Sequence, residues 1–345
     1  MRLPMPLEDV PLQPRALEIL QGALRRDQVH HAYLFGGPEG AGKELAALRF
    51  MQALNCERQP AVGCGACGTC TRIAAHAHPD MHWVMPEVDL IARKLAGRTD
   101  FSDTPSRDVK IAQVRKLTER LSLKALSARR KVAIILKADR LNVPAQNALL
   151  KTLEEPPAET TIILISTAAD ALLPTIRSRC LRVPFVPLPL ESVAAQVARL
   201  RKLPLEQARL CARLAQGSLS RALELDAAKL AERATLFERL AGLSPDDARP
   251  ALRLAEELAE DRAQAEWGLA MVKLWLRDLL LLAEGAAIET LINVDLAPAL
   301  AATAQRCTPA RLLLQLAEVD EVEAAIARNG SPRMQLERLL LRGLA

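Results

Sequence analysis

Near its N-terminus the chain carries the stretch Tyr33-Leu34-Phe35-Gly36-Gly37-Pro38-Glu39-Gly40-Ala41-Gly42-Lys43-Glu44. An apolar run of strand character leads into a glycine-rich turn, and a segment with helical periodicity follows the turn. Glycines let backbone N–H groups turn inward onto an anion, the start of the helix adds partial positive charge, and the lysine reaches the outer phosphates. The spacing predicts a phosphate-binding loop formed by Gly37, Gly40, Gly42 and Lys43. The alternative is a glycine turn before a helix that holds no ligand.

The loop departs from its motif at the residue after the lysine. A Ser or Thr hydroxyl ordinarily ligates Mg²⁺ there, whereas this chain has Glu44. In a P-loop ATPase a later apolar strand ends in Asp-Glu, and here the corresponding places hold Leu136 and Lys137. Asp139 comes too late along the chain to replace them. We therefore expect no catalytic residue in cis and no ATP hydrolysis, while the retained lysine leaves ATP binding open.

Four cysteines lie close together just after the helix of this loop. Their spacing is Cys56-x7-Cys64-x2-Cys67-x2-Cys70, and four thiolates with two short steps can close a tetrahedral shell. In a reducing compartment such a cluster predicts one structural zinc ion before it predicts disulfides. The alternative is four free or disulfide-bonded cysteines. Downstream histidines (His76, His78 and His82) could compete as ligands, but four cysteines already complete the shell.

The composition indicates a mostly helical protein of two or three domains. Half of the 345 residues are hydrophobic and only 3% are aromatic, so the core must consist of Ala, Leu, Val and Ile. The richest apolar run, Leu269–Ala283, is interrupted by Lys273, Arg277 and Asp278, which argues against a membrane span. The N-terminus has no charged region followed by an apolar signal core, so we expect a cytoplasmic protein with no membrane partner.

One segment of the chain is strongly basic, although the net charge of the whole chain is only +5. Residues 110–131 contain eight basic side chains against one acid, Glu119. Apolar residues at helical spacing run through the segment, so the bases are predicted to lie on the exposed face. This face is either a solvated helix surface or a surface that meets DNA phosphates, and the sequence leaves both open.

Two further motifs follow: Asn147-Ala148-Leu149-Leu150-Lys151-Thr152-Leu153-Glu154-Glu155-Pro156-Pro157 and Ile176-Arg177-Ser178-Arg179-Cys180. Together with the four-cysteine insertion, they resemble the bacterial clamp-loader subunits of the AAA+ class. That family has an ATP-hydrolysing subunit and a related one whose nucleotide site has decayed. The residues at Glu44, Leu136 and Lys137 make this sequence similar to the second kind.

The resemblance implies a three-part architecture. The expected first part is an α/β P-loop (RecA-like AAA+) domain over residues 1–187, with a parallel sheet and a zinc insertion at 56–70. A small helical lid over 188–226 and an all-α C-terminal collar over 227–345, which would serve oligomerisation, are expected to follow. A plain helical bundle would give the same pattern in the last part.

The implied function is that of a non-catalytic subunit supporting ATP-driven loading of a sliding clamp onto primed DNA during replication. Its expected partners are the other clamp-loader subunits in a hetero-pentamer and, through the complex, the clamp and primer–template DNA. The first alternative is a catalytically active clamp-loader ATPase. The second is a zinc-dependent DNA-binding protein on a P-loop scaffold.

The resemblance also assigns a role to Arg179, the arginine of the Ser-Arg-Cys turn. In the family this arginine reaches across a subunit boundary to the γ-phosphate held by a neighbour. A guanidinium suits that task because it is always charged and presents a planar fork of donors. The alternative is a structural arginine that pairs with an acid of its own domain.

Overall fold

The computed structural model of the chain describes residues 13–244, 246–328 and 330–342. The first residues of the predicted P-loop domain and the last residues of the predicted collar therefore lie outside the described residues. Contacts divide the chain into two compact units. The first is Met1–Pro189 with Gly217–Ser220, and the second is Leu190–Gln216 with Arg221–Ala345. The separation of a lid (188–226) from a collar (227–345) stays a prediction.

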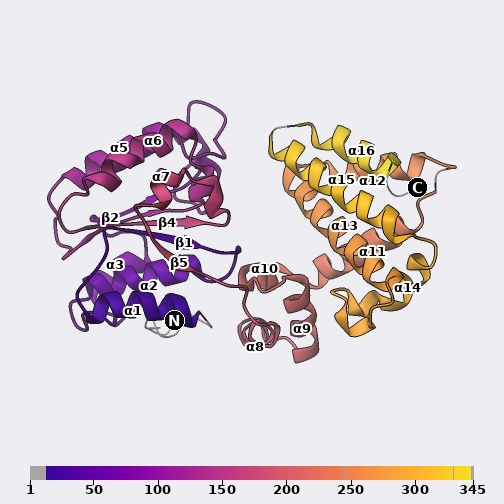
Figure 1. Cartoon of the computed structure of the whole chain (residues 1–345), viewed down its shortest axis with the longest axis horizontal. Helices are drawn as coiled ribbons and strands as arrows, with labels where there is room; N and C mark the ends of the chain where they lie inside the picture. The colour runs from indigo at the N-terminus through magenta and orange to yellow at the C-terminus, as the bar shows by residue number, and fades with distance from the viewer. Residues whose placement is uncertain (1–12, 245, 329, 343–345) are drawn as a thin grey trace. The chain divides into compact units, whose positions relative to one another are not determined.

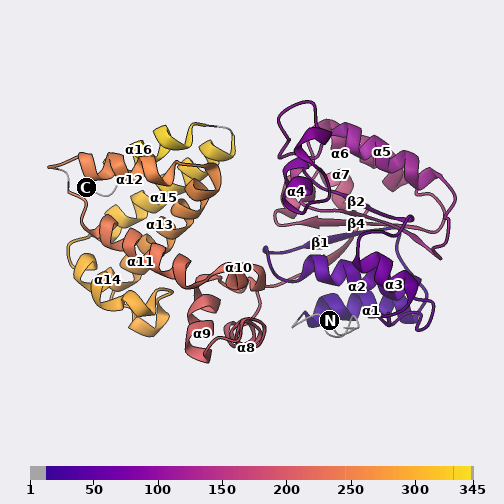
Figure 2. The same ribbon diagram turned by 180° about the vertical axis from the view of Figure 1, so that it is seen from behind.

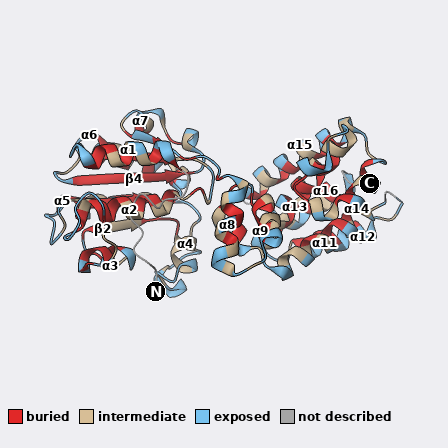
Figure 3. Ribbon diagram, turned by 90° about the horizontal axis from the view of Figure 1, so that it is seen from below, coloured by how far each residue is buried: buried red, intermediate tan, exposed pale blue. Residues whose placement is uncertain are grey.

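A five-stranded parallel sheet forms the centre of the first unit (Figure 1). Its strands are β1 (Ala32–Gly36), β2 (Met81–Val84), β3 (Lys131–Ile135), β4 (Thr160–Ser166) and β5 (Leu181–Pro184), in the order β2-β3-β4-β1-β5. Every pairing is parallel. The two strands with continuous apolar runs, β3 and β4, are buried along their whole length, as parallel strands covered on both faces require. Figure 3 shows β4 coloured as buried.

Helices cover both faces of this sheet. They are α1 (Pro14–Arg25), α2 (Lys43–Asn55), α3 (Gly68–Ala74), α4 (Glu87–Ala92), α5 (Ile111–Ser122), α6 (Val143–Glu154) and α7 (Pro174–Arg177). Tyr33 and Phe35 face a core shared with α1 and α2, whereas Leu34 faces a core shared with α5 and α6. Because side chains alternate along β1, the two cores lie on opposite faces of the sheet (Figures 1 and 2). The predicted P-loop domain is confirmed.

The second unit is entirely helical in its described residues. Its helices are α8 (Leu190–Arg201), α9 (Leu205–Leu214), α10 (Leu219–Glu224, which begins in the first unit), α11 (Ala227–Ala241), α12 (Arg249–Leu258), α13 (Arg262–Ala283), α14 (Ala297–Ala304), α15 (Pro309–Ala327) and α16 (Pro332–Arg342). The long helix α13 packs against α14 and α15, and the apolar run predicted from sequence lies inside it. Among the described helices, none combines the length and the apolarity that crossing a bilayer requires.

A buried carboxylate organises the polar part of this helical core. Asp278 on α13 is fully buried and accepts hydrogen bonds from the backbone N–H groups of Ile292 (3.1 Å) and Asn293 (2.8 Å) and from the Asn293 amide (2.8 Å). The Asn293 side chain in turn accepts from Arg233 at 2.7 Å, and Arg233 is itself 2% exposed. These bonds fasten the segment between α13 and α14 onto two helices.

We expect Asp278→Ala to lower the free energy of unfolding by about 3 kcal/mol, because it leaves buried donors without acceptors. Urea denaturation followed by circular dichroism measures the change. Asp320→Ala is the control, because the Asp320 side chain is 61% exposed and pairs only with Lys273 in a surface ion pair. Equal stability of the two variants would contradict the structural role of Asp278.

Candidate functional site

The predicted phosphate-binding loop connects β1 to α2 at the carboxyl edge of the sheet. Gly37 and Gly40 have φ values of 151° and 72°, which residues with side chains rarely adopt. A Cβ atom at Gly37 would lie 2.2 Å from the carbonyl oxygen of Phe185, and one at Gly40 would lie 1.9 Å from Ser218 Oγ. The loop therefore has the backbone conformation that its glycines predict and is closely surrounded by its own chain.

The lysine of the loop is turned onto the loop itself. Lys43 is 6% exposed, and its Nζ donates hydrogen bonds to the carbonyl oxygens of Gly37 (2.5 Å) and Pro38 (2.6 Å). Burial lowers the pKa of Lys43 to about 8, against the opposing effects of Glu39 and Asp139. A phosphate entering the loop must therefore compete with two carbonyls for this ammonium.

The outer side of the loop is covered by the segment Gly217–Ser220. The backbone N–H of Leu219 donates to the carbonyl oxygen of Gly40 at 3.3 Å, and Ser218 is buried. Sequence reasoning did not predict this contact, because the two segments are far apart along the chain. The side chains of Ser218 and Ser220 lie beside Gly40 and fill part of the space that a ligand at this loop would need.

Two of the three positions that depart from the ATPase motif form ion pairs with residues on or next to one short helix. Glu44 makes two contacts with the guanidinium of Arg93, at 2.5 and 2.8 Å, and the Glu44 carboxylate raises the pKa of Arg93. Lys137 pairs with Asp89 at 2.7 Å. Asp89 lies on α4 and Arg93 directly follows it. Glu44, at the position of a Mg²⁺ ligand, and Lys137, at the position of the acid that orients water, are thus engaged by the protein, and sequence reasoning missed both partners.

Asp139 is held at the end of the neighbouring strand. Its Oδ1 accepts hydrogen bonds from the hydroxyl of Ser166 (2.8 Å) and the backbone N–H of Thr167 (3.0 Å). These bonds join the turn after β3 to the end of β4. The carboxylate lies close enough to Lys43 to act on its pKa, so the exclusion of Asp139 as the missing acid stays a prediction.

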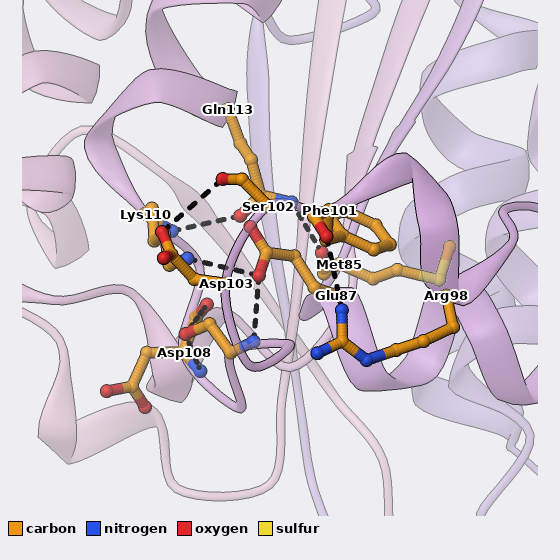
Figure 4. Close-up of polar contacts among 10 residues, drawn as sticks. Met85, Glu87, Arg98, Phe101, Ser102, Asp103, Asp108, Lys110 and Gln113 are labelled. Atoms are coloured by element: carbon orange, nitrogen blue, oxygen red, sulfur yellow. Dashed lines mark hydrogen bonds and ion pairs between the residues drawn. The ribbon is translucent and has the colours of Figure 1, made fainter.

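Hydrogen bonds and an ion pair hold both ends of the segment that carries α4 (Figure 4). The Glu87 carboxylate accepts from the backbone N–H of Ser106 (2.8 Å) and from Lys110 Nζ (3.1 Å). The side chain of Gln113 accepts from the Lys110 backbone N–H (2.9 Å) and donates to the Met85 carbonyl (2.8 Å). The segment that supplies Asp89 and Arg93 is therefore fastened at both ends to the sheet domain.

The four predicted metal ligands come together between α2 and α3. The sulfur atoms of Cys56, Cys64, Cys67 and Cys70 all lie within 4.8 Å of one another, and those of Cys56 and Cys67 are 3.9 Å apart. A tetrahedral zinc shell with Zn–S bonds of about 2.3 Å has S–S edges of roughly 3.8 Å. Among the described residues this is the one cluster with metal-ligand geometry, and no histidine belongs to it. The cluster can hold a metal ion.

Backbone N–H groups point at the sulfur atoms, as they do when thiolates are stabilised. Gln59 and Cys64 donate to Cys56 Sγ (3.2 and 3.3 Å), and Cys70 donates to Cys67 Sγ (3.4 Å). Burial favours the thiol of Cys67, but these donors outweigh it and lower the pKa of Cys67 to about 6. Burial raises the pKa of Cys70, and a cation bound by the cluster would favour the thiolate form of this ligand.

Arg179 lies in the turn after α7, with its side chain 35% exposed. Its guanidinium pairs with Glu154 at 2.7 Å and donates to the carbonyl oxygen of Thr175 at 2.9 Å. The pairing is the one that the structural alternative predicts. Because both partners of the ion pair are substantially exposed, it is worth only about 0–1 kcal/mol and does not confine the arginine to this position.

The basic segment is less exposed than predicted. Lys131 is 6% exposed and its ammonium donates to the carbonyl oxygens of Leu121 and Leu123 at the end of α5. Arg130 pairs with Glu159 at 3.1 Å. The expectation that all eight bases lie on the exposed face was wrong at Lys131, because a buried ammonium satisfies the free carbonyls of a helix end. Five exposed bases remain on α5 and the loop after it: Arg115, Lys116, Arg120, Lys124 and Arg129.

Comparison with known proteins gives matches along both units. A family model described as DNA polymerase III, delta subunit, matches residues 12–189, and one described as DNA polymerase III, delta subunit, C terminal, matches residues 227–343. DNA polymerase III subunit delta′ of Bacillus subtilis is 37% identical over 177 residues, which are 51% of this chain and 48% of that protein. DNA polymerase III subunit tau of Escherichia coli is 34% identical over 233 residues, which are 64% of this chain and 32% of that protein.

Solved structures are also similar to the chain. A DNA polymerase III gamma subunit-related protein of Thermotoga maritima has a TM-score of 0.41 and 17% identity, with 93% of this chain and 97% of that chain covered. The two curated relatives are considerably longer than the region they share with this chain, which spans about half and about a third of their lengths.

Proposed function

The chain belongs to the DNA polymerase III delta-subunit family, and we propose that it is a delta-prime-type subunit of the clamp loader, which takes part in ATP-driven loading of the sliding clamp onto primed DNA without hydrolysing ATP itself. Its proposed partners are the other clamp-loader subunits in a hetero-pentamer, with the clamp and primer–template DNA contacted through the complex. The proposed compartment is the cytoplasm. One observation carries the non-hydrolysing role: Glu44 and Lys137 stand at the positions of Mg²⁺ and water-activating ligands and are already paired with Arg93 and Asp89.

The competing function is an active clamp-loader ATPase. It is favoured by the retained Lys43 and by the intact backbone shape of the loop at Gly37 and Gly40. Hydrolysis by the isolated chain separates the two functions. A zinc-dependent DNA-binding protein is a third candidate, and salt-dependent affinity of the isolated chain for DNA would favour it.

We also propose that the four-cysteine cluster holds one structural zinc ion. Four thiolates leave no open coordination position, so the metal supplies stability and no catalysis. Its binding would fasten the end of α2, which Cys56 directly follows, to α3, which contains Cys70.

Protein purified without chelator should contain one zinc ion per chain, measured by inductively coupled plasma mass spectrometry. Cys64→Ser combined with Cys67→Ser should lose the metal, because two remaining thiolates do not close a tetrahedral shell. The matched control is Cys211→Ser, since that cysteine lies in the helical unit outside the cluster. Full zinc content in the double variant would refute the assignment.

The isolated chain should hydrolyse no ATP above background in a coupled assay with excess Mg²⁺. Neither Glu44 in its ion pair nor Leu136 and Lys137 can supply a hydroxyl ligand, a metal-bound acid or a base for water. The variant Lys43→Ala is the control for contaminating activity. Hydrolysis by the natural chain that disappears in this variant would establish the competing function.

The proposed contribution of this chain to catalysis lies in trans, through Arg179. The guanidinium sits on an exposed turn and its only ionic partner in the described chain is Glu154. On approach of a neighbour's γ-phosphate, exchange of one exposed carboxylate for a phosphate group costs little. In the competing role Arg179 is purely structural and only forms the ion pair with Glu154.

In the assembled complex, Arg179→Ala should lower the DNA- and clamp-stimulated ATPase only in part, because the other subunits keep their own arginines. Arg177→Ala is the matched control: it removes an arginine that also has an exposed ion pair, with Asp170, but it should cost less because the trans role is assigned to the arginine of the Ser-Arg-Cys turn. Glu154→Gln distinguishes the two roles: it removes the intrachain ion pair, so a structural arginine would show the same loss in both variants. An Arg179→Ala complex that works at the unmodified rate would exclude the trans role.

A further inference from the structure

The four cysteines of the cluster between α2 and α3 differ in their access to solvent. Cys56, Cys67 and Cys70 are at most 2% exposed, whereas Cys64 is only partly buried. A cysteine is oxidised where the oxidant can reach its sulfur, and buried structural cysteines are inert. Within this cluster, Cys64 is therefore the sulfur that is open to chemical attack.

The sequence around Cys64 accounts for its exposure. Its neighbours along the chain are Gly63, Gly65 and Ala66, none of which has a side chain long enough to cover a sulfur atom. Ala66 is exposed, and Val62 on the other side is 46% exposed. The segment that carries Cys64 thus faces solvent, although the cluster it belongs to is otherwise buried.

Cys67 is the cysteine best placed to react with an oxidised Cys64. Two residues separate them, and one of these, Gly65, has a φ of 67°, so the chain turns back on itself. The backbone N–H of Cys67 donates to Cys64 Sγ at 3.2 Å. A disulfide between these two sulfurs closes one short turn, whereas bonds to Cys56 or Cys70 would join the turn to the end of α2 or to the inside of α3.

We propose that Cys64 is a site of reversible oxidation by hydroperoxides, and that its oxidation ends in a disulfide with Cys67. The two thiolates that remain, those of Cys56 and Cys70, do not close a tetrahedral shell, so a zinc ion held by the cluster would be released. The inference goes beyond the proposed function and does not depend on the clamp-loader role. It uses the proposed zinc ion as a reporter of the reaction.

The chemistry takes place in two steps. In the first, the Cys64 thiolate attacks one oxygen of hydrogen peroxide; an S–O bond forms, the O–O bond breaks, and hydroxide leaves. Sulfur is oxidised to a sulfenic acid and the peroxide is reduced. In the second step the Cys67 thiolate attacks the sulfenic sulfur; the S–S bond forms, the S–O bond breaks, and a second hydroxide leaves. Protons from solvent convert both hydroxides to water.

The primary test maps the disulfide in the full-length chain. The chain is treated with an equimolar amount of hydrogen peroxide, its remaining thiols are capped with N-ethylmaleimide in denaturant, and it is digested with trypsin. Cleavage at Arg49, Arg58 and Arg72 places Cys56 in the peptide 50–58 and the other three cysteines in the peptide 59–72. The expected product is the peptide 59–72 with an internal disulfide and its cap on Cys70, located by fragmentation, while Cys56 is fully capped.

Zinc release, followed with a colorimetric chelator, tests the position of the reactive sulfur. Cys64→His should release zinc at least about tenfold more slowly than the natural chain, because histidine is also a zinc ligand but carries no oxidisable sulfur. Cys307→Ser is the matched control, since Cys307 is also partly buried but lies in the helical unit. It should release zinc at the natural rate. If Cys64→His holds no zinc, the peptide map of the natural chain still decides.

Each outcome supports or overturns the inference. A first disulfide that contains Cys56 or Cys70, zinc release while Cys64 is still capped, or a Cys64→His chain that loses zinc at the natural rate overturns it. A chain purified without zinc refutes the zinc assignment alone, because the peptide map still shows which sulfurs have joined. Dithiothreitol and added zinc should restore four free thiols and one bound ion, and failure to do so would overturn the reversibility of the modification.

Discussion

The structure around the predicted phosphate-binding loop depends on charged side chains that find their partners within the protein. A phosphate-binding loop ordinarily obtains its counter-charges from a nucleotide and Mg²⁺. In this chain the protein supplies them: the carbonyls of Gly37 and Pro38 hold the ammonium of Lys43, and Arg93 holds Glu44. A buried polar group without a partner costs more than one hydrogen bond contributes, so the contacts of the buried Lys43 in particular determine how the loop packs.

Helix α4 connects the two altered positions. In an ATPase the metal ion joins the start of the loop helix to the end of the β3 strand through their ligands. Here Arg93 and Asp89, at the end of one short helix and on it, pair with Glu44 at the start of the loop helix and with Lys137 just after β3. Each pair is partly exposed and contributes at most about 1 kcal/mol, so the pairs matter less for stability than for the electrostatics of the site. Each pair places a charge of opposite sign beside the residue that replaces a motif side chain.

Patterns within short stretches predicted the sheet domain and the cysteine cluster well. The glycine spacing before Lys43 and the cysteine spacing from Cys56 to Cys70 each lie within a short stretch of sequence. The geometry of such a stretch depends little on distant parts of the chain. The partners of Glu44 and Lys137 were missed because each lies almost fifty residues away, on or directly after the short helix α4. The burial of Lys131 was missed for a related reason: a charged residue is ordinarily placed at the surface, and the carbonyls that draw it inward belong to another element.

The retention of Lys43 is weak support for nucleotide binding once its contacts are known. Lys43 donates hydrogen bonds to two carbonyl oxygens of its own loop, so it contributes to the structure of the loop even without Mg²⁺ ligands nearby. The same contacts oppose a phosphate, because the ammonium must leave both carbonyls before it can bind one, and burial already favours its neutral form by lowering its pKa. The segment that covers Gly40 adds a steric barrier on the outer side. The backbone shape of the loop and its lysine are therefore accounted for by contacts within the protein, and neither of them by itself requires a bound nucleotide.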